Sequence, residues 1–317
     1  MSAVIRFVIR RLLYAIIVLW LVSTLVFVFL HVSPVPVERV IGGPRATTDT
    51  LNQIRRNLGL DQPVIVQYGQ FLGRLLHANL GDSYINGEPV TTLIGDRLPT
   101  TLWLVLGAGV IWFVGGVVTG VLSATRARSL PDRVVTVFVL IGLSTPPFVM
   151  ALVLLYLFST KLSEAGIYFF EAGPPLQMHF FRRMILPWIA LAFLMVAAYT
   201  RLTRGAMLDV LGEDYVRTAR AKGLSRRRVV YRHGLRAALT PVVTQFGIDL
   251  GALIGSTIVT EKVFGLQGVG QLVYQSIALG DTPVIIGVTL MVTFFVIVAN
   301  LLVDIGYSFL DPRVRLS

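Results

Sequence analysis

The sequence predicts an all-α protein that crosses a membrane six times, and three observations lead to this prediction. Of its 317 residues, 55% are hydrophobic and only 14% are charged, whereas soluble domains carry about 25% charged residues. Six apolar stretches approach or exceed the roughly 20 residues that a helix needs to cross the hydrocarbon core. Inside lipid, backbone polar groups must be satisfied within the segment itself, which favours helices over open strands.

The six predicted spans differ in regularity. Pro146 and Pro147 interrupt the third span, and the fourth span is short unless its flanking residues extend it. In chain order, the predicted spans are residues 12–32, 101–124, 134–159, 184–199, 239–260 and 284–307. Together they make one transmembrane domain of residues 1–317, with a long outer loop at 33–100 and an inner loop at 201–238.

The first apolar run has a basic flank, as a secretory signal peptide does. Arg6, Arg10 and Arg11 precede it. However, the run is longer than the 7–15 residues of a signal-peptide core, and the segment from His31 to Pro34 is a poor small-residue cleavage site. We therefore expect an uncleaved first helix.

The distribution of arginine and lysine predicts the orientation in the membrane. The two termini and the loops after spans two and four hold 18 of these residues, and the longer loops on the other side hold 10. Because positive residues concentrate on the cytoplasmic side, we expect both termini in the cytoplasm of a multi-pass inner-membrane protein. Ten of the basic residues lie between Arg201 and Arg236, which is the origin of much of the net charge of +11.

Several chemistries have no matching pattern in this sequence. There is no cysteine, which excludes disulfides, thiolate metal sites and cysteine nucleophiles. No phosphate-binding loop or paired-histidine zinc motif occurs, and the basic loop lacks the aromatic platforms that nucleic-acid binding uses. We expect no catalytic residue, no bound metal, no cofactor and no nucleic-acid partner.

The inner loop carries an internal pattern that a charged tail does not need. Glu213 and Asp214 suit the first turn of a helix, apolar positions recur at helical spacing from Tyr215 onward, and Gly223 is placed to end the helix. Either this is a plain surface helix whose charges contact anionic lipid, or its small side chains admit the groove of another protein. The pattern alone leaves both interpretations open.

The residues of this loop resemble a known motif. The loop is similar to the cytoplasmic coupling loop, or EAA loop, of permease subunits in binding-protein-dependent ABC importers, because Arg217-Thr218-Ala219 followed by Gly223 occupies the register E-A-A-x-x-x-G. Arg217 replaces the acidic residue, and Arg236 stands where a later proline is usual. Both departures match the peptide-uptake branch, which typically reads A-R-A-K-G here, as do Ala219 to Gly223.

Further segments strengthen the resemblance. They are Thr260-Glu261-Lys262-Val263-Phe264 with Gly268 and Gly270, Gly280-Asp281-Thr282-Pro283, the stretch from Asn300 to Tyr307, and Asp311-Pro312-Arg313. On these motifs the chain is identified as a member of the dipeptide/oligopeptide permease family, in its first-subunit form, with the type I ABC importer permease fold.

The resemblance implies a function and a set of partners. It implies a channel subunit for short peptides, driven by ATP hydrolysis on two cytoplasmic ATPase subunits. A second homologous permease, an extracytoplasmic peptide-binding protein and membrane lipids complete the expected assembly. Because coupling motifs do not report the substrate, nickel chelates, haem and oligosaccharides remain alternatives, as does a membrane scaffold without a transport role. The residues expected to couple to the ATPases are Arg217, Thr218, Ala219, Ala221, Lys222, Gly223, Leu224 and Ser225.

Two places in the predicted spans suggest a lining for the channel. Pro146 and Pro147 free backbone carbonyls and bend the third span, either beside a pathway or for packing alone. In the fifth span Gln245, Asp249 and Ser256 share one face at 100° per residue. An acid at that depth normally faces a bundle interior or a watered cavity. Asp249 makes either a structural hydrogen bond or a transient contact with the ammonium group of a passing peptide.

The outer loop at 33–100 is too long for a passive connection. It mixes turn signals with helical patches at residues 50–58 and 64–76. It either packs on the membrane surface or docks the peptide-binding protein.

Overall fold

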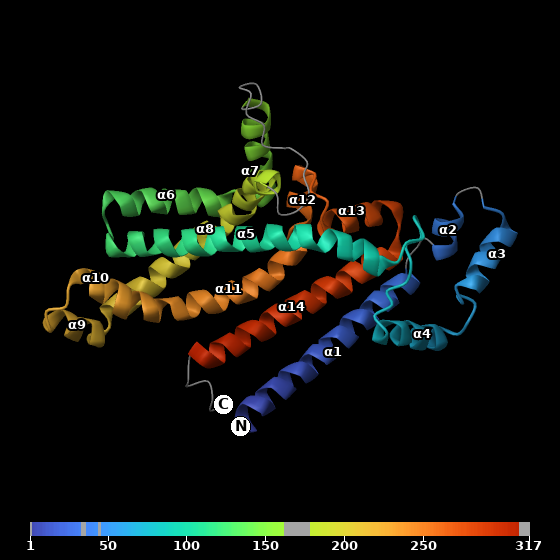
Figure 1. The fold of residues 1–317 in the computed structure, drawn as a ribbon, viewed down its shortest axis with the longest axis horizontal. Coiled ribbons are helices and arrows are strands. Elements are labelled where there is room, and N and C mark those ends of the chain that lie inside the picture. Colours follow the sequence, from blue (N-terminus) through green and yellow to red (C-terminus); the bar gives the residue numbers. More distant parts are fainter. Residues whose placement is uncertain (1, 33–35, 44–45, 162–177, 311–317) are drawn as a thin grey trace. The chain divides into compact units, whose positions relative to one another are not determined.

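The computed structural model describes residues 2–32, 36–43, 46–161 and 178–310 (Figure 1). These residues are helical over most of their length, and within them no strand longer than an isolated bridge occurs. They form two compact units. The first contains the described residues up to Thr101 together with Gln267–Leu301, and the second contains Leu102–Leu266 and the end of the last helix.

The first unit holds the outer loop against two spanning helices. The apolar core of this unit joins α1 (Ser2–Val32), α4 (Val64–Leu76) and α14 (Thr282–Leu310), through the buried side chains Phe27, Phe71, Ile286 and Leu290. The hydroxyls of Thr24 and Tyr68 are 2.7 Å apart and add a polar tie between α1 and α4. Two shorter helices, α2 (Val37–Gly42) and α3 (Thr48–Asn57), precede α4. The helical patches expected at 50–58 and 64–76 are therefore confirmed, as α3 and α4.

A turn at the end of the outer loop is fixed to the start of α14. Asp281, which is 3% exposed, precedes the helix and accepts hydrogen bonds from the Ser83 hydroxyl and, at 3.0 Å, from the backbone N–H of Tyr84. Burial raises the pKa of the Tyr84 phenol above its ordinary value. The preceding helix, α13 (Val269–Leu279), ends at Gly280, so this corner brings together segments almost 200 residues apart in sequence.

The second unit is organised around α8 (Met178–Gly212). Helices α6 (Leu130–Ser144), α7 (Pro147–Leu155) and α11 (Arg236–Ser256) pack against α8, and α5 (Val90–Thr125) runs beside α6 in Figure 1. A π-helical turn, η1 (Tyr156–Lys161), follows α7, and α12 (Ile258–Phe264) follows α11. Between α8 and α11 the chain forms α9 (Asp214–Ala221), α10 (Arg226–Arg228) and the π-helical stretch η2 (Val229–Leu235).

The expected six spans correspond to five single helices and one bent pair. The single helices are long and apolar enough to cross a membrane at Ile9–Phe29, Val90–Thr125, Phe181–Gly212, Arg226–Ser256 and Thr282–Leu301. The pair is Leu130–Ser144 with Pro147–Phe158, which meet at a bend of 101°. The described helices are therefore long enough for up to six crossings.

The ends of the spans differ from the sequence prediction. Helix α5 begins at Val90 rather than at residue 101, and α8 continues to Gly212, well beyond the predicted end at residue 199. Both extensions contain charged residues, such as Asp96 and Arg204, that lower the local hydropathy without breaking the helix. Helical continuation outside an apolar stretch carries no hydropathy signal, so the predicted start of α5 is too late and the predicted end of α8 is too early.

Candidate functional site

The segment predicted to couple to an ATPase forms a short helix. Glu213 is extended, with φ −67° and ψ 148°, and α9 runs from Asp214 to Ala221. At Gly223 the backbone φ is +77°, a left-handed value that residues with a β-carbon rarely adopt. The predicted helix and its glycine stop are therefore confirmed.

One face of α9 is buried against the chain itself. Val216 is fully buried and Ala219 is 6% exposed; both pack with Val229 of η2, and Leu224 is half-buried at the edge of this cluster. The cluster also contacts Val210 and Leu211 at the end of α8. Helix α9 is thus seated on α8 and η2 by its apolar stripe, as an amphipathic surface helix is.

The other face of α9 is exposed in the part of the chain that the structure describes. The exposed residues among the expected coupling set are Arg217, Thr218, Ala221, Lys222, Gly223 and Ser225. Ala219 does not share this face, so the expectation that its small side chain admits a partner's groove is corrected. Which face of a short helix is buried depends on the residues that it packs against, here Val229 and Leu211. The sequence pattern alone does not identify those residues.

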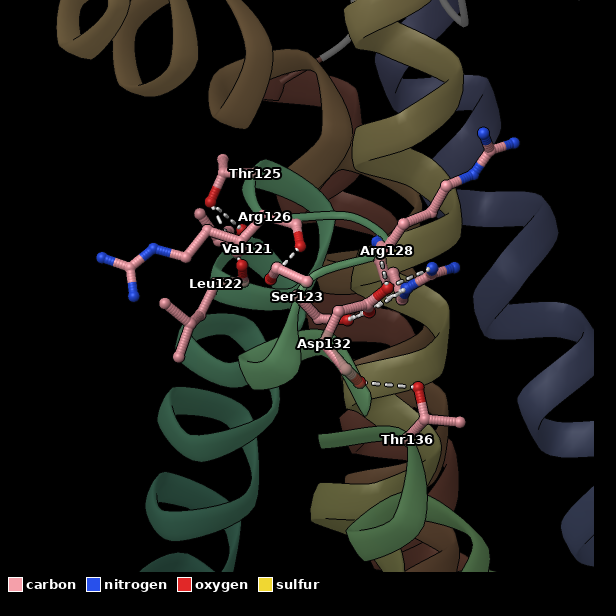
Figure 2. Close-up of polar contacts among 10 residues, drawn as sticks. Val121, Leu122, Ser123, Thr125, Arg126, Arg128, Asp132 and Thr136 are labelled. Carbon is pink, nitrogen blue, oxygen red and sulfur yellow. Dashed lines mark hydrogen bonds and ion pairs between the residues drawn. The ribbon is translucent and has the colours of Figure 1, made fainter. Parts of the chain in front are cut away.

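Next to the coupling segment lies a polar cluster at the start of α6 (Figure 2). Asp132 is 5% exposed. Its carboxylate accepts hydrogen bonds from the Ser123 hydroxyl and, at 2.8 Å, from the backbone N–H of Arg128. The guanidinium of Arg204 donates to the two carboxylate oxygens from Nε at 3.0 Å and from Nη2 at 3.1 Å. This bidentate pair joins α8 to the turn between α5 and α6.

Close approach of α5 and α8 brings these groups together. A β-carbon at Gly116 would lie 2.4 Å from the Tyr199 Cβ, and one at Gly120 would lie 2.6 Å from the Thr203 Cβ. Neither position admits a larger residue without a shift of the helices. Ser123 lies one turn after Gly120, and Arg204 directly follows Thr203, so the glycine contact positions the cluster.

Sequence reasoning missed Asp132, Arg204 and Ser123. It counted the arginine only as topology-setting charge, because the two charged partners are 72 residues apart. One signal was present: Gly116 and Gly120 form a small-xxx-small pattern in an apolar run, which is typical of closely packed helices. That pattern indicates close packing but does not identify the partner helix.

The two consecutive prolines separate α6 from α7. Thr145 is extended, with φ −98° and ψ 114°, as expected of a residue that precedes proline. Pro146 is extended too, and Pro147 begins α7, where proline is well tolerated. The expected bend at these residues is present as a turn of 101°, too sharp for a kink within one straight helix. Pro146 is exposed and Pro147 is half-buried.

The polar residues of α11 lie on one face and have local partners. Asp249 is half-buried and accepts hydrogen bonds from the hydroxyl of Tyr199 at 2.8 Å and from the Gln245 side-chain amide at 2.9 Å. Gln245 and Ser256 are exposed in this chain. On the same helix Gly247 and Gly251 are buried, so the helix has a packing side and a polar side.

Comparison with known families decides the identity of the chain. A family model described as "Binding-protein-dependent transport system inner membrane component" matches residues 116–316, and its N-terminal companion matches residues 4–105. The chain belongs to this family. The sequence resemblance to the dipeptide/oligopeptide permease family is confirmed, and this permease is a transport subunit rather than an enzyme.

Individual relatives match the permease over its whole length. "Glutathione transport system permease protein GsiC" from Escherichia coli strain K12 is 37% identical over 98% of this chain and 99% of the relative. The protein of the same name from Salmonella choleraesuis strain SC-B67 is also 37% identical, with the same coverage. A solved structure described as "Crystal structure of an amino acid ABC transporter with histidines" aligns with a TM-score of 0.47 at 18% identity, over 70% of this chain and 94% of that one.

Family membership settles the coarse function. The protein is a multi-pass inner-membrane permease subunit of an ABC importer, and such permeases work with ATPase subunits and a substrate-binding protein. The alternative of a scaffold without a transport role is therefore set aside.

Proposed function

We propose that this permease forms half of a channel that moves short peptides into the cytoplasm, with glutathione as the first candidate. The observation that carries this proposal is 37% identity, over 98% of the chain, to permeases named for glutathione transport. Glutathione is a tripeptide with a free ammonium group, so it belongs to the class of substrate that the sequence motifs suggested.

We assign the pathway to the polar side of α11. Gln245 and Ser256 are exposed on a spanning helix, and exposed polar groups are costly against lipid. This face therefore borders a watered path, with the Asp249 carboxylate beside it. The sharp turn at Pro146 and Pro147 contributes non-helical backbone, which membrane proteins tolerate where it is covered by protein or lines a cavity.

We infer the rest of the assembly from the family and from the exposed face of α9. A second homologous permease completes the channel, and two ATPase subunits dock on the exposed face of α9, which carries Arg217, Thr218, Ala221 and Lys222. The extracytoplasmic peptide-binding protein docks on the outer loop at 33–100, and both termini lie in the cytoplasm.

Transport by the purified complex in proteoliposomes tests this function. With ATP inside and the cognate binding protein outside, we expect uptake of labelled glutathione or trialanine and none of a nickel chelate, haem or maltotriose. Uptake of one of the latter three without peptide uptake would contradict the proposal.

A further inference from the structure

The contact between Asp132 and Arg204 links α8, on which the coupling helix α9 packs, to the turn between α5 and α6. Asp132 is buried, and its carboxylate is shared by α5, the α5–α6 turn and α8 through Ser123, Arg128 and Arg204. A bidentate pair of this kind fixes direction as well as distance. It therefore restrains how α8 moves relative to the first turn of α6.

Arg204 lies on the same helix, α8, whose end carries the coupling helix. Continuous helix runs from Arg204 to Gly212, roughly 12 Å at 1.5 Å per residue, and the extended residue Glu213 then joins α8 to α9. Val216 and Ala219 of α9 pack with Val210 and Leu211 at the end of α8. A displacement of α9 consequently moves the end of α8.

A second tie reaches the same turn from the other end of the coupling segment. Arg226, just after α9, donates a hydrogen bond from Nη2 to the backbone carbonyl of Thr125 at 2.6 Å. Thr125 is the last residue of α5. The α5–α6 turn is thus bonded to Arg204, which precedes α9 in the chain, and to Arg226, which follows it. From this turn, α6 leads directly to the 101° bend.

Packing stability alone does not require a charged pair at this place. The pair is only partly buried, because the Arg204 side chain is 35% exposed; even a fully buried ion pair can often be replaced by well-packed apolar residues with stability unchanged or raised. Val121 and Ala124 of α5 already pack against Met207 of α8, so the helices have an apolar contact independent of the pair. What the bidentate pair adds to this apolar contact is a fixed direction and distance.

We propose that Asp132 and Arg204 form a clamp, through which movement of α9 is transmitted to the α5–α6 turn and so to α6. They are positioning residues for transport. The proposal rests on the function proposed above in one respect, that α9 is the docking site of an ATPase.

The test compares the wild-type complex with an apolar double variant, Asp132→Leu with Arg204→Met. Two cysteines are introduced for spin labelling, Ala127→Cys in the α5–α6 turn and Gly212→Cys at the end of α8. Because the chain has no cysteine of its own, the permease is labelled at these two positions and nowhere else. On ATP binding we expect an unchanged distance distribution in the wild-type background. In the double variant we expect a shifted or broadened one, because the turn no longer follows α8.

Transport supplies the second readout. In proteoliposomes the double variant should retain its ATPases and their hydrolysis of ATP, while the peptide moved per ATP falls at least about threefold, within the range for changes in a coupling network. Arg204→Lys, which keeps the charge and loses the bidentate contact, should give a smaller fall. Arg201→Gln and Arg133→Gln, exposed neighbours of the pair, serve as controls and should match the wild type.

The outcomes separate the clamp from simpler roles. Identical label distances with unchanged transport per ATP would overturn it and assign transmission to the apolar contact. Failure of the double variant to assemble would overturn it in favour of a purely structural role. A wild-type complex that moves no peptide contradicts the proposed substrate alone, because the label distances still test the clamp.

Discussion

Asp249 keeps both carboxylate oxygens occupied by neighbours within its own chain. Tyr199 donates to one oxygen and Gln245 to the other. These donors are neutral, so the negative charge is not cancelled, and each oxygen retains a second acceptor position. Asp249 can therefore keep its hydrogen bonds to Tyr199 and Gln245 and also accept one from the ammonium group of a passing peptide.

We predict that Asp249→Asn separates these two contributions. The variant retains the shape of the side chain and removes the charge, so uptake of free-amine peptides should slow about tenfold, as expected for one hydrogen bond to a charged group. Uptake of N-acetylated peptides should change little, provided the binding protein delivers both. Gln245→Glu is the matched variant with added charge. Equal slowing of both peptides in Asp249→Asn would favour a structural role.

Helix α9 shows how one short element serves two contacts at once. Its buried stripe attaches it to α8 and η2, and its opposite face is exposed. The exposed pair of Arg217 and Asp214, 3.7 Å apart, contributes little to stability because both partners are solvated. The exposed face is therefore available for docking without loss of the fold.

A tryptophan scan of α9 should distinguish the two faces. Ala221→Trp adds bulk on the exposed face, so substrate-stimulated ATP hydrolysis should be lost while membrane insertion stays intact. Ala219→Trp overpacks the cluster with Val216 and Val229, which costs about 1–3 kcal/mol, and should also increase proteolysis of the inner loop. Ala237→Trp, at an exposed position on α11, is the control. Normal stimulation in Ala221→Trp would refute docking at this face.

The bend between α6 and α7 depends on the residue that precedes the prolines. We predict that the double variant Pro146→Ala with Pro147→Ala permits positions 145 and 146 to become helical, since in the wild type each precedes a proline and is kept out of the helical region. Spin labels at Val137→Cys and Leu152→Cys, both exposed, should then move further apart as the bend opens. Pro146→Ala alone should have a smaller effect, because position 146 still precedes Pro147. An unchanged distance in the double variant would show that tertiary packing holds the bend.

At the scale of the whole molecule, charge distribution predicts the topology. Cysteines introduced one at a time into the cysteine-free chain should be labelled from the cytoplasm at Arg128, Arg227 and Arg313 and from outside at Asn86 and Gly173. Gly268 is buried, so a reporter fused at this position replaces the label and should also lie outside. Gly173 and Arg313 lie outside the described residues. An impermeant maleimide on sealed vesicles of both orientations makes the measurement. Cytoplasmic labelling of Asn86 would overturn the orientation.

The spans could be predicted because the length of an apolar stretch is read directly from consecutive residues. The sites were harder to predict because they depend on contacts between residues far apart in sequence. Five spans and the bend at Pro146 and Pro147 could be located from composition and proline alone. The end of α8 could not, because the charge of Arg204 is neutralised by a residue 72 positions earlier. The burial of Ala219 likewise depends on Val229, which follows it by ten residues and lies on a different helical segment.

The ion pair of Asp132 and Arg204 also constrains the order of events during biosynthesis. The carboxylate emerges from the ribosome 72 residues before its arginine, which is about 4–14 s at a synthesis rate of about 5–20 residues per second. During this interval the Asp132 carboxylate lacks its bidentate arginine partner, and a carboxylate inside a bilayer is costly. We therefore expect the first turn of α6 to stay in contact with water until Arg204 has been made.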